Sequence, residues 1–366
     1  MTEQAFIPPA RPLIGDEERA AVDRVLRSGM LAQGPEVAAF EQEFSDHFGL
    51  DRACVAVNSG TSGLHLGLLS AGVGPGDEVI VPSFTFAATA NSVALTGATP
   101  IFADIDPATF CLDASAVEAT ITPRTVGIMP VHLYGHPADM AALQSLSEQH
   151  GLQIFEDAAQ AHGASFNGTP VGAFGSFGMF SLYPTKNMTS GEGGMVSVAS
   201  AEVERLLRLY RNQGMQRQYE NEIVGYNARM TDLHAAIGRV QLTKVAGWTR
   251  TRQQNAAFLS AHLEGVVVPV VDPRAVHVFH QYTVRVPEDR DGMAKALREE
   301  HQVGSGMFYP VPNHRLPSLR SDVDLPETDR AARECLSLPV HPSVSEGDLE
   351  RIVTAVNAVA RAGASR

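Results

Sequence analysis

The chain has 366 residues, 44% of them hydrophobic and 19% charged, a composition typical of a globular protein with room for two domains. Its formal net charge of −13 argues against general binding to nucleic acid or to an anionic membrane, because both need a basic surface. Its three cysteines (Cys54, Cys111 and Cys335) are widely spaced and predict reduced core thiols, and with no signal peptide or membrane-length apolar run we expect a cytoplasmic protein.

Residues 54–199 alternate short apolar runs with helical stretches. Strands are expected at residues 54–59, 78–83, 99–105, 126–134 and 152–159, and on both sides of the stretch 181–195. The stretches between them, 61–72, 84–97 and 140–151, have helical spacing. Near-continuous apolar strands separated by helices predict an α/β fold whose mostly parallel sheet is covered on both faces.

The alternation of apolar strands and helices ends at about residue 200. An amphipathic helix is expected at residues 201–214, a polar irregular segment at 215–231, and a long helix at about 232–263 with possible weak points at Gly238 and Gly247. The remainder mixes β-like pieces (279–286 and 304–311) with helical ones (292–301 and 345–363). We therefore predict a large α/β domain over residues 1–245 and a smaller α+β domain over residues 246–366, with a hinge between 235 and 265.

The first motif of interest follows the first predicted strand, where Gly60-Thr61-Ser62-Gly63 opens a helix. Glycines let the backbone approach a phosphate, and the helix N-terminus offers unpaired N–H groups. The alternative is that Thr61 or Ser62 only caps the helix. No Gly-Lys-Ser/Thr of a P-loop and no GxGxxG is present, so nucleotide binding by those motifs has no support.

Asp157 ends another predicted strand and is followed by Gln160 and His162. A buried strand-end carboxylate needs a cation or several donors, so it serves either in a structural ion pair or in holding a ring nitrogen protonated. We expect His162 to be a core histidine. A metal site built from His132, His136, Asp157 and His162 would match no compact ligand spacing, and no metal is expected.

Lys186 lies in SLYPTKNMTSGEGGM, and the only other lysines of the chain are Lys244 and Lys295. Taken alone, an exposed loop lysine is the commoner case. A phosphate cradle, a strand-end aspartate and a lysine beside Ser181 are together explained by pyridoxal phosphate. That cofactor needs a lysine for its Schiff base, an acid facing its ring nitrogen and a phosphate pocket, and Phe86 is placed to cover the ring.

The ordered motifs resemble those of the DegT/DnrJ/EryC1/StrS aminotransferases. The resemblance covers nearly the whole chain and rests on NSGTSGLHLGLLSAGVGPGDEVIVPSFTFAATANSV, PVHLYGHPADM, EDAAQAHGA, SLYPTKNMTSGEGGM, GYNARMTDLHAAIGRVQL and LSLPVHPSVSE. It implies a pyridoxal phosphate-dependent transferase fold of type I with a seven-stranded sheet. It also implies that Lys186 forms the Schiff base, Asp157 pairs with the pyridine nitrogen and Gln160 bonds the ring hydroxyl. The further cofactor contacts that it implies are Thr61, Ser62, Ser181 and Phe86.

The resemblance also predicts contacts across a subunit boundary. Asn227, in the GYN motif, resembles an asparagine that reaches the phosphate of the neighbouring subunit, which implies a homodimer with two composite sites. Arg229 is either a contact for an anionic substrate group or a member of an ordinary ion pair. Tyr309 and His314, in MFYPVPNH, fall where the family presents groups toward a sugar nucleotide.

The expected reaction moves an amino group from glutamate to a keto sugar nucleotide by a ping-pong mechanism. A lysine at position 186, where some members have histidine and act as dehydratases, favours transamination. PTKNMTSGEGGM looks closer to members that aminate C4 of a 4-keto-6-deoxyhexose than to C3-specific ones. The alternatives are a C3-keto sugar nucleotide, a keto-cyclitol, or a catalytically idle binding protein. Glu192 has no assigned role.

Overall fold

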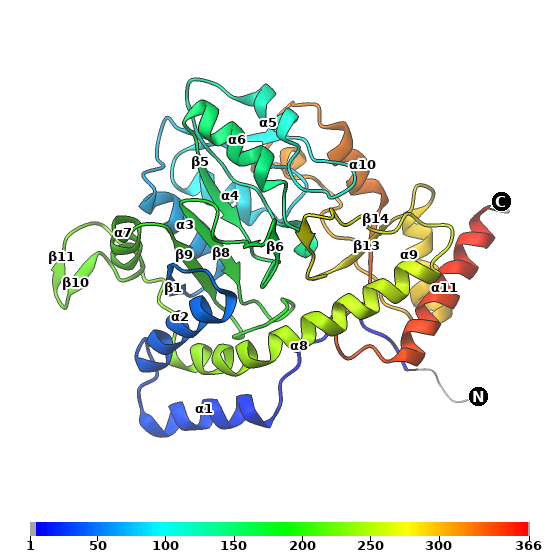
Figure 1. Ribbon diagram of the computed structural model, residues 1–366, viewed down its shortest axis with the longest axis horizontal. Helices are drawn as coiled ribbons and strands as arrows, with labels where there is room; N and C mark the ends of the chain where they lie inside the picture. Colours follow the sequence, from blue (N-terminus) through cyan, green and yellow to red (C-terminus); the bar gives the residue numbers. More distant parts are fainter. Residues whose placement is uncertain (1–4, 365–366) are drawn as a thin grey trace.

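The computed structural model describes residues 5–364 and is built around a seven-stranded sheet (Figure 1). The strand order is β1-β9-β8-β5-β4-β2-β3. The strands are β1 (Ala53–Val57), β2 (Glu78–Pro82), β3 (Thr99–Ala103), β4 (Thr125–Ile128), β5 (Gln153–Asp157), β8 (Phe177–Ser181) and β9 (Gly194–Val198). All neighbours pair in parallel except β9, which is antiparallel to both β1 and β8. The expected mostly parallel sheet is confirmed.

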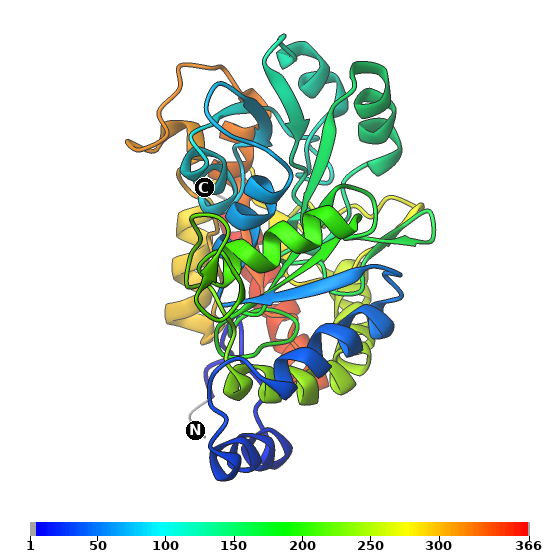
Figure 2. The same ribbon diagram turned by 90° about the vertical axis from the view of Figure 1, so that its left-hand side faces the viewer.

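Helices cover both faces of this sheet. One apolar cluster joins it to α3 (Gly60–Ser70), α4 (Ala88–Leu95) and α7 (Ala201–Arg211). Two clusters on the other face join it to α5 (Ala114–Thr120) and α6 (Met140–His150), and to α2 (Pro35–Phe48) and α8 (Asp232–His262). Figure 2 shows α7 in front of the sheet with α1 (Asp16–Ser28) at the bottom. Burial on both faces explains why these strands have apolar residues at nearly every position.

A separate apolar cluster forms the core of the C-terminal part. It joins β13 (Tyr282–Arg285) and β14 (Cys335–Leu338), which pair antiparallel, to α9 (Arg290–His301) and α11 (Glu346–Ala364). Helix α8 runs from beneath the large sheet to this cluster (Figure 1). The domain division at residues 245 and 246 falls inside α8 and stays a prediction.

Helix α8 continues without a break through both glycines that were expected to weaken it. A side chain at Gly238 would place its Cβ 2.6 Å from the ring of Phe40 in α2. That glycine is therefore needed for close helix packing. Thr231 caps the helix by accepting a hydrogen bond from the backbone N–H of His234.

The remaining elements are short. Residues 304–311, expected as β-like, form no strand, and only Gly306 makes an isolated bridge, to Ser337. Within residues 5–364 no helix has the length and apolar character needed to cross a membrane. The small elements are α10 (Pro326–Glu334), β6 (Ser165–Phe166), β7 (Thr169–Pro170), β10 (Met215–Arg217), β11 (Glu220–Asn221), β12 (Ala275–Val276) and the 3-10 turns Leu133–Gly135 and Asn313–Arg315.

Candidate active site

The carboxyl ends of β1 and β8 and the start of β9 form one edge of the sheet. Gly194 is paired with Val57 on one side and with Ser181 on the other, so the three residues lie in one row. Ligands of open α/β sheets bind at this edge. The predicted site residues that end or follow β1, β5 and β8 are therefore brought to one side of the molecule.

The first turn of α3 lies beside Ser181. A Cβ on Gly60 would lie 3.3 Å from Ser181 Oγ, so only glycine leaves the space between them open. Ser59 caps the helix by accepting from the backbone N–H of Ser62, and its own Oγ donates to Ser62 Oγ at 3.0 Å. The N–H groups of Gly60 and Thr61 have no acceptor among the described residues. Unpaired N–H groups, hydroxyls and a helix N-terminus can together bind a phosphate.

Asp157 ends β5 and is 5% exposed. Thr89 Oγ1 donates to its Oδ2 at 2.8 Å, and the N–H of Ala159 donates to Oδ1 at 3.1 Å. Burial raises the pKa of this carboxyl, while the hydrogen bond from Thr89 and the nearby Lys186 cation oppose that rise. Sequence reasoning missed Thr89, although it lies in the stretch 84–97 that was expected to form a helix after the strand at residues 78–83.

Lys186 lies on the turn after β8, where its backbone N–H donates to the carbonyl of Tyr183 at 3.0 Å. Burial of the amine lowers its pKa to about 8, and the negative charge of Asp157 limits that fall. An amine with this pKa is partly deprotonated near neutral pH, and its neutral form can act as a nucleophile or as a base.

Gln160 belongs to the same site through both ends of its amide. Its Oε1 accepts from the backbone N–H of Tyr134 at 2.7 Å, and its Nε2 donates to the hydroxyl of Tyr309 at 2.8 Å. The rings of Tyr134 and Tyr309 are stacked with centroids 6.4 Å apart. Burial raises the pKa of Tyr309, so this hydroxyl stays protonated at neutral pH. Tyr309 thus lies beside Gln160, and its predicted contact with a sugar nucleotide stays a prediction.

The other predicted residues lie at the rim or outside the site. Phe86 precedes α4 and is 64% exposed. Asn227 is exposed, in an isolated bridge with Asn212, and Arg229 donates to the side chain of Asn212 at 2.7 Å. His314 is fully buried and its Nδ1 lies 2.7 Å from Ser83 Oγ, so its contacts hold the chain after β2.

His162 is the expected core residue. Its ring packs against Phe44, Phe48 and Phe180, and neither ring nitrogen has a hydrogen-bond partner in the described part of the chain. Burial and the Lys186 cation lower its pKa to about 3, so the ring is neutral. The same described residues contain no group of three or more side chains able to hold a metal ion.

Comparison with known proteins agrees with this geometry. The profile of the DegT/DnrJ/EryC1/StrS aminotransferase family matches residues 12–357. The chain belongs to this family. The dTDP-3-amino-3,4,6-trideoxy-alpha-D-glucose transaminase of Streptomyces venezuelae is 42% identical over 348 residues, 93% of this chain and 91% of that protein. The UDP-N-acetyl-3-dehydro-alpha-D-glucosamine 3-aminotransferase of Acidithiobacillus ferrooxidans is 39% identical over 346 residues, 93% of each.

Solved structures of related aminotransferases have the same fold. A crystal structure of S. venezuelae DesV superimposes with a TM-score of 0.91 at 40% identity, covering 97% of this chain and 99% of that chain. NtdA of Bacillus subtilis, crystallised with the cofactor PMP, gives a TM-score of 0.92 at 29% identity, covering 99% and 86%. This aminotransferase therefore has the fold of the pyridoxal phosphate-dependent enzymes and uses that cofactor. The expected aminotransferase is confirmed, and the alternative of a catalytically idle binding protein is set aside.

Proposed function

We propose that this aminotransferase moves the amino group of glutamate to C3 of a keto sugar carried by a nucleoside diphosphate. The observation that carries the proposal is that Lys186, Asp157 and the N-terminus of α3 meet at one edge of the sheet. Two relatives about 40% identical to this chain support the choice of C3, because their names place the amino group at position 3 of the sugar.

The residues at this edge fit pyridoxal phosphate. The N–H groups of Gly60 and Thr61 and the hydroxyls of Ser62 and Ser181 would hold its phosphate. Asp157 would face the ring nitrogen, with Thr89 fixing the carboxylate. Phe86 would cover the ring and Gln160 would reach the ring hydroxyl. When bound, the cofactor supplies an electron sink and carries the amino group between the two half-reactions.

Lys186 has two tasks in this proposal. Its neutral amine would hold the cofactor covalently, which the pKa of about 8 permits near neutral pH. When it is not bonded to the cofactor, the same amine would act as the base that takes a proton from Cα of the amino donor and as the acid that gives this proton back. Both tasks need an amine that changes its protonation state, which the arginines of this chain cannot supply.

A second copy of the chain would complete the site. Asn227 is exposed, and so are Tyr219, Val224 and Tyr226 of the surrounding segment. Figure 1 shows the β10–β11 hairpin of that segment projecting from the body of the molecule. Exposed apolar side chains on a projecting segment support a homodimer in which Asn227 reaches the partner's phosphate site.

Amination at C4 is the alternative acceptor position. The observation in its favour is the run PTKNMTSGEGGM around Lys186, which looks closer to C4-specific members. The two positions differ only in which carbonyl of the sugar is presented to the bound amine, so the sheet and the lysine are common to both.

A single-turnover screen tests the proposal. Protein reconstituted with pyridoxal phosphate is first treated with glutamate, and loss of its visible absorbance band reports the first half-reaction. The amine form is then mixed with 3-keto or 4-keto sugar nucleotides. We expect the 3-keto sugar to restore the band fastest. If only the 4-keto sugar restores the absorbance band, the assignment of C3 is wrong. If glutamate leaves the band unchanged, the assignment of glutamate as the amino donor is wrong.

A further inference from the structure

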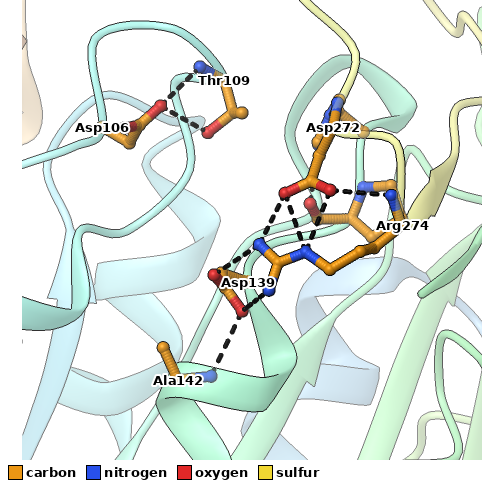
Figure 3. A network of polar contacts seen from close by, with 8 residues as sticks. Asp106, Thr109, Asp139, Ala142, Asp272 and Arg274 are labelled. Carbon is orange, nitrogen blue, oxygen red and sulfur yellow. Dashed lines mark hydrogen bonds and ion pairs between the residues drawn. The ribbon is translucent and has the colours of Figure 1, made fainter. Parts of the chain in front are cut away.

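One segment of the chain contacts both the turn that carries Lys186 and the residues that hold Gln160. Residues 277–281, called here the crossing segment, lead into β13 and the C-terminal core. Its upstream end is anchored on the large sheet's side by the network in Figure 3, where Arg274 donates to both Asp139 and Asp272. Phe279 has a φ of 44°, a left-handed conformation that is unfavourable for a side chain of this size.

The crossing segment holds the residue next to Lys186. Asn187 is buried, its Nδ2 donates to the carbonyl of Val278, and its Oδ1 lies 3.1 Å from Nδ1 of His280. A carbonyl only accepts, so the amide nitrogen must face Val278 and the amide oxygen must face His280. Nδ1 of His280 therefore carries the proton. Burial and the cations Lys186 and Arg252 lower the pKa of His280 well below its ordinary value, so its other nitrogen is unprotonated.

The same segment reaches the opposite side of the site. The N–H of Val278 donates to the carbonyl of Gly135, and that of Gln281 donates to the carbonyl of Tyr134. Gly135 has a φ of 95° and no room for a side chain, because a Cβ there would lie 3.0 Å from the backbone nitrogen of His280. The N–H of Tyr134 in turn holds Gln160.

A buried arginine of α8 holds the backbone of the crossing segment. Arg252 of α8 donates from Nη1 to the carbonyls of Phe279 and His280, each at 3.2 Å. It forms no ion pair with a carboxylate in residues 5–364, and burial lowers its pKa to about 10. Two carbonyls on one guanidinium hold the backbone in its left-handed turn, which presents His280 to Asn187.

We propose that Asn187 and His280 are positioning residues that hold the turn carrying Lys186 through the Nδ1–H···Oδ1 hydrogen bond. The proposal rests on the proposed role of Lys186 as the lysine that binds the cofactor. The hydrogen bond would keep the amine near the groups that interact with it electrostatically, namely Asp157 of β5, His162 on the turn that follows β5 and His280 itself. A loosened turn would let the amine move toward solvent.

Two substitutions at one position separate the hydrogen bond from packing. His280→Asn places an N–H where Nδ1 lies, whereas His280→Gln places its amide one carbon farther away. Asn187→Ala removes the acceptor. Arg274→Ala is the matched control, since it loosens the same stretch of chain at its exposed end, away from Lys186.

Two measurements are made on each variant. In cofactor-free protein, the pH dependence of Lys186 labelling by an amine reagent, followed by peptide mass spectrometry, gives the pKa of the amine. In reconstituted protein, kcat and KM are measured for glutamate and acceptor. Circular dichroism and urea unfolding check that each variant folds.

We expect Asn187→Ala and His280→Gln to raise the pKa of Lys186 above about 8, toward its ordinary value. Their kcat should fall about 10- to 100-fold with KM nearly unchanged, the size expected when a catalytic group is misplaced by about 1 Å. His280→Asn should recover most of the kcat that His280→Gln loses, and Arg274→Ala should behave as the wild type.

An unchanged Lys186 pKa and kcat in both Asn187→Ala and His280→Gln would overturn the proposal, as would equal defects in His280→Asn and His280→Gln. Either result would leave the proposed function intact if wild-type protein still binds the cofactor at Lys186. Failure of the wild type to do so would overturn the proposed function itself.

Discussion

Glu156 and Asp157 are neighbouring carboxylates at the end of β5, and the protein uses them in opposite ways. Glu156 accepts from the backbone N–H groups of Gly172, Phe174 and Gly175 and from His132. Asp157 has one hydroxyl and one N–H as donors and the Lys186 cation nearby. Successive strand residues point to opposite faces, so one carboxylate faces a loop and the other faces the site.

The histidines associated with the two carboxylates repeat the contrast. His132 accepts at Nδ1 from the N–H of Ala138, so its Nε2 carries the proton that is donated to Glu156. His162, on the turn after Asp157, has no partner for either nitrogen among residues 5–364. His132 is thus held by polar partners at both ring nitrogens, whereas His162 is held by its aromatic neighbours. Of the two carboxylates, Asp157 has fewer donors and keeps the capacity for a further one, as expected of a group that takes part in chemistry.

The largest effect is expected from Asp157→Asn. An amide cannot hold a ring nitrogen protonated as a carboxylate does, so kcat should fall by about 10³-fold, within the range for removal of a general acid or base. Because Asp157 raises the pKa of Lys186, the same variant should lower that pKa below about 8 in cofactor-free protein. Steady-state kinetics and the labelling titration measure both. A near-normal kcat in this variant would contradict the assignment of Asp157 to the chemistry of the site.

Glu156→Gln should reduce stability and leave turnover nearly unchanged. Both oxygens of Glu156 accept from backbone N–H groups, so an amide nitrogen on either side would face a donor. We expect the free energy of unfolding to fall by about 2–4 kcal/mol, as for a buried network that loses one partner. Urea unfolding measures this. Turnover per folded molecule should stay within about threefold of wild type, and a fall as large as that of Asp157→Asn with unchanged stability would contradict the assignment.

Thr89→Val tests the support of Asp157. It removes the only hydroxyl that donates to the carboxylate in the described structure while keeping the volume of the side chain. The pKa of Asp157 should rise further, because that hydrogen bond opposes the effect of burial. We expect about a tenfold loss of kcat, equivalent to one hydrogen bond to a charged group of about 1.4 kcal/mol. Thr89→Ser, which keeps the hydroxyl, is the control, and its loss of kcat should be less than half as large as that of Thr89→Val.

His162→Leu should change how stability depends on pH. The folded-state pKa of about 3 lies below the ordinary 6.5, so between these values the unfolded chain binds a proton that the folded chain does not. Stability from the neutral ring is present above pH 6.5 and is lost as pH falls toward 3. The variant should reduce the slope of unfolding free energy by about 1 kcal/mol per pH unit in that window. An unchanged slope between pH 6 and pH 4 would contradict the unpaired, neutral state of His162.

The sequence was enough to predict the parts of the site that depend on strand ends. Lys186, Asp157 and Ser181 each follow an apolar run, and a parallel sheet brings such positions to one edge. Contacts between distant segments could not be predicted in this way. Ser83 meets His314 231 positions away, and Asn187 meets His280 93 positions away. No periodicity encodes such pairs, since they depend on how the C-terminal part packs on the sheet.

The central claim is that Lys186 binds the cofactor, and the small number of lysines makes it directly testable. Protein reconstituted with pyridoxal phosphate is reduced with borohydride, digested and mapped by mass spectrometry. The account predicts a cofactor adduct on the Lys186 peptide and none on Lys244, which is paired with Glu17 and Glu18, or on Lys295. An unmodified Lys186, whether or not another lysine is labelled, would contradict it.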